Sequence, residues 1–191
     1  MNLEALRAHC RLRTGDEAVP YLVSNDEWRN HLNEAQREVC IRARLLEDVL
    51  DIDGQPGDQH FPIPAHVLDI EYLEMVGTGL KVRHWESTRS TLHLSRPLRE
   101  PATLRGYIVR LPLADMLNDA DEPEIPERWH LRMCDWALHL AYMKQDAETF
   151  DQQAADRYAA LFAASFGHFH TANVQRKHRR NSPRVTRPID F

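Results

Sequence analysis

The sequence predicts a mainly α-helical protein of the α+β class, in which a helical bundle carries a small inserted antiparallel β-sheet and an extended C-terminal arm. Near both ends of the 191-residue chain, apolar residues recur at three- and four-residue steps, which is the period of a helix. Between these regions, apolar and polar residues alternate in short runs, which is the period of a strand. Hydrophobic residues make up 42% of the chain, which is enough for the core of a single domain.

Residues 1–57 are expected to form the N-terminal helices. A short helix is predicted over residues 2–12. A longer helix begins after Ser24, which precedes Glu27 at the spacing of a capping box, and it is predicted to run to about Leu50. The apolar face of this longer helix consists of Trp28, Leu32, Ala35, Val39, Ala43 and Leu46.

Residues 58–114 are expected to form the β insertion. The stretch at 51–58 is rich in glycine, proline and aspartate, a composition typical of a turn. Gly77 and Gly79 predict a hairpin turn inside the insertion. The expected strands belong to a single antiparallel sheet of about four or five strands, and they are residues 67–76, 80–85, 91–94 and 103–111.

Residues 115–172 are expected to form the C-terminal helices. An acidic linker leads to Pro126, which suits the first turn of a helix because an N–H at that position would have no partner. The apolar stripe of this helix consists of Trp129, Met133, Trp136, Leu140 and Met143. A third helix is predicted over residues 152–169, with an apolar face made of Ala155, Tyr158, Ala159, Phe162 and Phe166.

Residues 173–191 are expected to form an extended, basic arm. The whole chain has a formal net charge of −5, whereas residues 174–191 contain six basic side chains and one acidic side chain. The rest of the chain is therefore strongly acidic. A basic tail on an acidic body indicates that the tail contacts something outside the body, or that it is a solvated terminus. The arginine-rich segment ends in apolar residues, which suits docking into an acidic protein groove.

The sequence contains no signature of catalysis. Paired-cysteine, His-Glu-x-x-His, phosphate-loop and Gly-x-Ser-x-Gly motifs do not occur. The three cysteines are far apart and odd in number, which predicts reduced thiols. No apolar run approaches the length of about 18 residues that a transmembrane helix requires, and residues 1–10 have no apolar signal core.

Two alternative functions remain open on these residues alone. The first is a nucleic-acid-binding regulator that uses the basic tail, although the acidity of the rest of the chain weighs against it. The second is a small metal-dependent enzyme, because Asp135 and His139 lie one helical turn apart and other histidines are available. The candidate ligands for such a metal are Asp135, His139, His168 and His170.

Three stretches resemble the head-to-tail adaptor proteins of tailed bacteriophages, which are also called connector or head-completion proteins. The most specific is residues 21–38, with the pattern Tyr-Leu-x-Ser-Asn-Asp-Glu followed by Leu-Asn-Glu-Ala-Gln-Arg-Glu. The others are the phrase that begins at Ile63-Pro64 and the phrase that runs from Ile125 to Trp129. The resemblance implies a structural virion protein without enzymatic activity, cofactor or metal.

The resemblance also implies an assembly. Twelve copies would form a ring beneath the portal, with the helices packed around a channel through which genomic DNA passes without sequence-specific binding. The implied partners are the portal protein, neighbouring adaptor subunits and a downstream tail or stopper protein, with no membrane. The implied location is the neck of the virion, and the host cytoplasm during assembly.

Two groups of residues acquire a role from the resemblance. Residues 174–191 would dock on the portal, and the polar side of the helix that begins near residue 24 would face neighbouring subunits. The portal-binding residues would be Arg176, Lys177, Arg179, Arg180, Arg184, Arg187, Ile189 and Phe191. The residues of the subunit contact would be Glu34, Arg37, Glu38 and Arg44.

Overall fold

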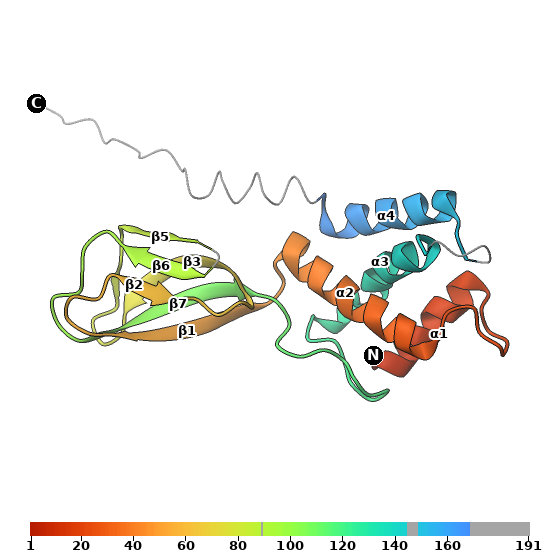
Figure 1. Cartoon of the computed structure of the whole chain (residues 1–191), viewed down its shortest axis with the longest axis horizontal. Coiled ribbons are helices and arrows are strands. Elements are labelled where there is room, and N and C mark those ends of the chain that lie inside the picture. The colour runs from red at the N-terminus through yellow and green to blue at the C-terminus, as the bar shows by residue number, and fades with distance from the viewer. Residues whose placement is uncertain (89, 145–148, 169–191) are drawn as a thin grey trace, which may run out of the picture.

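The computed structural model describes residues 1–88, 90–144 and 149–168. Within these residues, four α-helices form a helical body at one end of an elongated molecule, and seven strands form a β domain at the other end (Figure 1). Two chain segments connect the body with the β domain, one after helix α2 and the other after strand β7.

This architecture is mixed α+β, so the expectation of a mainly helical bundle with a small inserted sheet is wrong. The described strands build two antiparallel sheets, with the strand orders β1-β7-β3-β4 and β2-β6-β5. The long helix α2 (Asn25–Ala43) stops well before Leu50. The segment after it, which the sequence pattern assigned to helix and turn, forms strand β1 (Glu47–Gly54).

The end of α2 shows why the local pattern misled. Arg44 takes the left-handed conformation at φ 56°, and its N–H donates to the carbonyl oxygen of Cys40, which closes the helix. Leu46 lies beyond this end but is buried in the core of the helical body, so it continues the apolar period of the helix. Strand β1 then pairs along its whole length with β7 (Ala102–Arg110). Pairing with a strand this distant in sequence leaves no mark on local periodicity.

The helical body has one core, and α3 contacts each of the other three helices (Figure 1). The predicted helices over residues 2–12 and 152–169 are confirmed, each with its end displaced by a few residues. Trp28 and Phe162 are the largest side chains that the body buries completely. Besides α2, the helices are α1 (Leu3–Thr14), α3 (His130–Tyr142) and α4 (Gln152–Phe166), and the 3-10 turn Glu127–Trp129 leads into α3.

The β domain is a sandwich of the two sheets around a separate core. Its buried side chains include Phe61, Leu73, Leu92 and Leu104. Gly54 permits the close approach of the sheets, because a Cβ there would lie 2.9 Å from Cε1 of Phe61. The strands besides β1 and β7 are β2 (His60–Pro62), β3 (Val67–Met75), β4 (Leu80–Lys81), β5 (Trp85–Ser87) and β6 (Thr91–Leu94).

Most of the predicted strands are confirmed. Those over residues 67–76, 91–94 and 103–111 match β3, β6 and β7 to within one residue at each end. The turn is also confirmed, since Gly77 and Gly79 have φ angles of 91° and 65°. The single strand predicted over residues 80–85 is wrong. This stretch crosses from one sheet to the other, so β4 and β5 belong to different sheets.

The start of α2 confirms the predicted capping box. The Glu27 N–H donates to Oγ of Ser24 at 3.2 Å, and the Ser24 N–H donates to Oε2 of Glu27 at 2.9 Å. Lys144 adds a hydrogen bond from Nζ to Oε1 of Glu27 at 2.7 Å. The Lys144 ammonium, followed by the Ser24 N–H, lowers the pKa of Glu27 from 4.5 to about 2.

This shift predicts a pH-dependent stability. A carboxyl group whose pKa is lower in the folded than in the unfolded state stabilises the fold above its unfolded pKa, and this contribution is lost as the pH falls toward its folded pKa. The free energy of unfolding of Glu27→Gln is therefore expected to lie below wild type at neutral pH and to converge on it between pH 4.5 and about 2. Urea unfolding at several pH values measures the difference. Lys144→Met is the control: in its background Glu27→Gln should have a smaller effect, because only the hydrogen bond from the Ser24 N–H is left to lower the pKa of Glu27. A stability difference that does not vary with pH contradicts the prediction.

Candidate assembly interface

Two of the four charged residues predicted at the subunit contact remain on the surface of the helical body. Nη1 of Arg37 lies 3.3 Å from Oε2 of Glu34, and the two side chains are 38% and 53% exposed. Nη2 of Arg37 also donates to Oδ2 of Asp115 at 2.6 Å. The Glu34–Arg37 pair is thus oriented by its own chain and still presents charge to the outside.

The third residue, Glu38, is turned toward the neighbouring helices. Its Oε1 accepts a hydrogen bond from Nε of Arg42 at 2.6 Å, and the two side chains are only 13% and 10% exposed. The guanidinium carbon of Arg42 lies 4.6 Å from the ring centroid of Trp136 and 4.9 Å from that of Phe162. Glu38 therefore holds the guanidinium of Arg42 against aromatic rings of α3 and α4.

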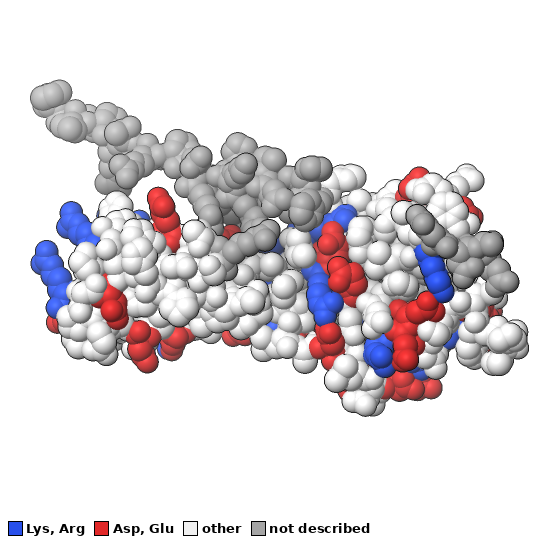
Figure 2. All heavy atoms as spheres, viewed as in Figure 1, with Lys and Arg blue, Asp and Glu red and all other residues white. Residues whose placement is uncertain are grey.

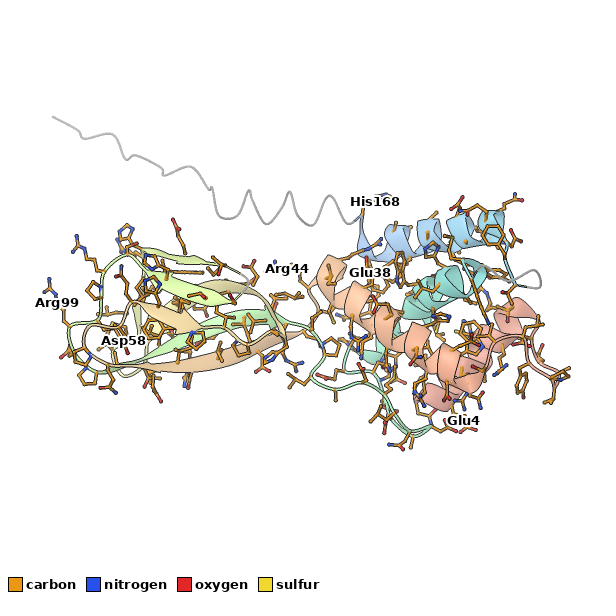
Figure 3. The ribbon with its side chains drawn as sticks, viewed as in Figure 1. Glu4, Glu38, Arg44, Asp58, Arg99 and His168 are labelled. Atoms are coloured by element: carbon orange, nitrogen blue, oxygen red, sulfur yellow. The ribbon has the colours of Figure 1, made fainter. Side chains whose placement is uncertain are left out.

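The fourth residue, Arg44, lies at the joint between the helical body and the β domain (Figure 3). Its Nη1 donates to Oδ2 of Asp69 at 3.0 Å, and its Nη2 lies 3.5 Å from Oε1 of Glu71, both on strand β3. The joint connects elements that pack on separate cores, so these ionic contacts help to fix the orientation of the β domain.

A second arginine, which the sequence did not identify, completes the joint. Nε of Arg110 donates to Oδ2 of Asp48 at 2.8 Å, and its Nη1 donates to Oε2 of Glu124 at 2.6 Å. Both carboxyl groups have lowered pKa values. In Asp48 the largest cause is the hydrogen bond from the Val49 N–H. In Glu124 burial alone would raise the pKa, but Arg110 and the N–H groups of Ala114 and Leu113 together outweigh it. No sequence spacing could reveal these contacts, because they join distant segments.

The acidic linker before α3 is fastened along α2 by two buried amides. Nδ2 of Asn33 donates to the Met116 carbonyl at 3.0 Å, and its Oδ1 accepts the Met116 N–H at 2.9 Å. Oε1 of Gln36 accepts the Glu124 N–H at 2.7 Å. Met116 is buried beneath the linker, and the neighbouring Asp115 binds Arg37, so the linker forms part of the surface beside Glu34 and Arg37.

The eight residues predicted to bind a portal lie outside the described residues. The last described residue, His168, follows the end of α4 on the side of the body that faces the joint (Figure 3). Nη1 of Arg42 lies 3.4 Å from the carbonyl oxygen of Gly167, which ties this end to α2. The described part of the chain therefore ends near the joint.

The residues proposed for a metal-dependent enzyme are not brought together. Asp135 is buried, and burial raises the pKa of its carboxyl group. Nδ1 of His139 lies 2.9 Å from the carbonyl oxygen of Ala155, and this contact joins α3 to α4. His168 is exposed, and His170 lies outside the described residues. Among the described residues, no cluster of three or more histidine, cysteine, aspartate or glutamate side chains is arranged to hold a metal ion.

The surface charges are mixed in sign over the body and the β domain (Figure 2). About half of the described arginines pair with a carboxylate of the same chain, as the contacts of Arg37, Arg42, Arg44 and Arg110 illustrate. None of the helices in the described part of the chain combines the length and the apolarity that crossing a membrane would require.

Similarity to known proteins extends over nearly the whole chain. The family described as SU10 adaptor protein matches residues 1–188, which include the helical body, the β domain and most of the arm. No curated protein matches the chain.

Proposed function

The chain belongs to the SU10 adaptor protein family, a family of structural proteins of bacteriophages, and we propose that it forms a ring beneath the portal that joins the DNA-filled capsid to the tail. The family match over residues 1–188 is the observation that carries this proposal. The proposed partners are the portal protein, neighbouring copies of this chain and a downstream tail or stopper protein. The ring would hold twelve copies in the neck of the virion, after assembly in the host cytoplasm.

The described structure supports this role in two ways. The helical body and the β domain have separate cores and are tied at the joint by Arg44 and Arg110, so each subunit can act as one elongated building block. The net acidic character of the chain outside the arm suits the wall of a channel that must let DNA slide, because it repels phosphates.

The test is reconstitution with the cognate portal. Purified full-length chain is mixed with portal rings, the complexes are isolated by sedimentation, and their images are averaged by electron microscopy. The proposal predicts an added ring on one end of the portal. Absence of any added density at saturating concentrations of the chain would overturn it.

Arg37 offers a test of the subunit contact in the same assay. Arg37→Glu is expected to reduce ring formation at least about tenfold, because a reversed charge at a contact adds repulsion and leaves a partner unpaired. Folding should change little, since exposed ion pairs contribute at most about 1 kcal/mol. The matched control is Arg29→Glu, which breaks the exposed Asp26 pair on the same helix. If both variants assemble alike, the contact lies elsewhere.

Glu38 is a poor choice for that experiment, although it was predicted at the same contact. Its carboxylate and Arg42 are largely covered by α3 and α4. A positively charged side chain in place of Glu38 would therefore lie beside the positive charge of Arg42, with little water to screen the repulsion. Such a change is expected to act on folding before it acts on assembly.

A further inference from the structure

A pocket of about 480 Å³ opens between the two sheets in the half of the β domain that lies away from the helical body. Its floor is apolar and includes Leu94 and Leu104, which the sandwich otherwise buries. The exposed side chain of Leu80 extends the apolar surface, because Leu80 pairs with Met75 of the pocket wall. The remaining lining residues are Val82, Arg83, His84, Ser95, Arg96 and Leu98.

Unpaired positive charge surrounds this pocket. Arg83 and Arg96 line it, and Arg99 follows Leu98 at the tip of the domain (Figure 3). Within the described part of the chain, no carboxylate forms an ion pair with these three exposed guanidinium groups. By contrast, Arg105 of the same domain is paired with Asp51 at 2.7 Å. Basic side chains protrude at this end of the molecule (Figure 2).

An apolar pocket bordered by unpaired arginines fits a particular kind of ligand. Arginine binds carboxylates through charge-assisted hydrogen bonds, and binding energy at protein interfaces concentrates where a large apolar side chain fills a pocket. A nucleic-acid backbone offers phosphates but no apolar side chain for the floor. Residues 47–110 also contain ten acidic and seven basic residues, so the domain as a whole does not attract DNA.

We propose that this pocket docks an acidic segment of a partner protein, with one large apolar side chain inserted between the sheets and carboxylates paired to Arg83 and Arg96. Docking at the tip would connect the chain to a component on the side opposite its helical body. The proposed ring is not required for this binding, which is a property of the single subunit.

A second copy of this chain is a less suitable occupant. Its acidic linker carries the exposed side chains of Leu113 and Leu117, but the carboxylates of this segment are already in use. Asp115 binds Arg37, and Glu124 binds Arg110 at the joint. Insertion of the linker into the pocket of a neighbour would have to break these contacts.

The probe is a fluorescein-labelled peptide of ten residues in which aspartates and glutamates flank a central Leu-Phe pair. Fluorescence anisotropy with the full-length chain is expected to show saturable binding, which Arg83→Glu combined with Arg96→Glu weakens at least tenfold. The control variant combines Arg128→Glu with Arg157→Glu, two exposed arginines of the helical body, and should bind as wild type does. A control peptide with serines in place of the Leu-Phe pair should bind at least tenfold more weakly.

Several outcomes would overturn the proposal. They are absence of saturable binding at millimolar peptide, equal binding of both peptides, and equal effects of the two double variants. If a DNA duplex bound at these arginines more tightly than the peptide and with an affinity that depends on salt, the partner would be a nucleic acid and not a protein. A lower sedimentation coefficient of the Arg83→Glu, Arg96→Glu protein alone would identify a second copy as the occupant. In the expected case, amide NMR signals of Val82, Leu98 and Leu104 shift on addition of the peptide.

Discussion

Replacing Asp16 with alanine is expected to lower the free energy of unfolding by about 3–5 kcal/mol, which is the cost of breaking a buried ion pair by removing one partner. Oδ2 of Asp16 accepts hydrogen bonds from Nη1 of Arg11 at 3.0 Å and from the Val23 N–H at 3.1 Å. Its Oδ1 accepts the Leu22 N–H at 2.8 Å. One carboxylate therefore satisfies a buried cation and folds the loop between α1 and α2 back onto the body.

The large expected effect follows from what alanine would leave behind. Arg11 is buried, and it also donates to the Val23 carbonyl at 3.1 Å and stacks 3.5 Å from the ring centroid of Tyr21. Without Asp16, its charge stays buried and uncompensated, and two backbone N–H groups lose their acceptor. Asp16→Asn keeps an acceptor oxygen but removes the charge, so it should lower the free energy of unfolding less than Asp16→Ala does.

Chemical denaturation at pH 7 measures the effect. The control is Asp26→Ala, which removes an exposed pair with Arg29 and should change the free energy of unfolding by at most about 1 kcal/mol. The double variant Arg11→Met, Asp16→Ala should lose less free energy of unfolding than the sum of the losses of the two single variants, because it leaves no unpaired charge. A loss for Asp16→Ala that equals that of Asp26→Ala would contradict a structural role for this network.

Asp16 also illustrates what the sequence could and could not predict. The predicted helices leave a break around Asp16, and this break is confirmed: Gly15 ends α1 with a φ of 71°, which a glycine adopts without strain. The partners of the carboxylate were not predictable. A buried arginine on α1 and the N–H groups of a returning loop come together only when the helices pack, and residue spacing does not encode that packing.

The rest of the fold shows the same difference between local features, which the sequence predicts, and long-range contacts, which it does not. Signals that act within a few residues were predictive, as the Ser24 cap and the turn at Gly77 show. Features created by distant pairing were missed: β1 exists because β7 lies beside it, and the joint exists because Arg44 and Arg110 meet carboxylates of other elements. At the candidate contact, spacing on α2 offered only the pairs of Glu34 with Arg37 and of Glu38 with Arg42, which lie three and four residues apart.

Deleting residues 174–191 is expected to abolish binding to the portal and to leave the helical body and the β domain folded. Among the described residues, the core of the helical body ends at Phe166, so the deletion removes none of the described core side chains. The expected loss of affinity is at least about 100-fold, because two apolar anchors and several charge-assisted hydrogen bonds at an interface each contribute about 1–3 kcal/mol.

Two variants separate the contributions of charge and apolar contact. In the first, glutamine replaces Arg176, Lys177, Arg179, Arg180, Arg184 and Arg187; in the second, serine replaces Ile189 and Phe191. The glutamine variant should lose most of the salt dependence of portal binding, because screening acts on the charges. The serine variant should bind weakly at every salt concentration.

The measurements are cosedimentation of each variant with portal rings over a series of salt concentrations, with circular dichroism and thermal unfolding to confirm the fold. Binding to a DNA duplex, measured on the same samples, addresses the remaining alternative. If the six positive charges served nucleic acid, the full-length chain would bind the duplex with an affinity that falls steeply with salt, and the glutamine variant would not. Portal binding by the truncated chain with unchanged affinity would remove the arm from the proposed contact and leave the surface around Glu34 and Arg37 as the remaining candidate for assembly.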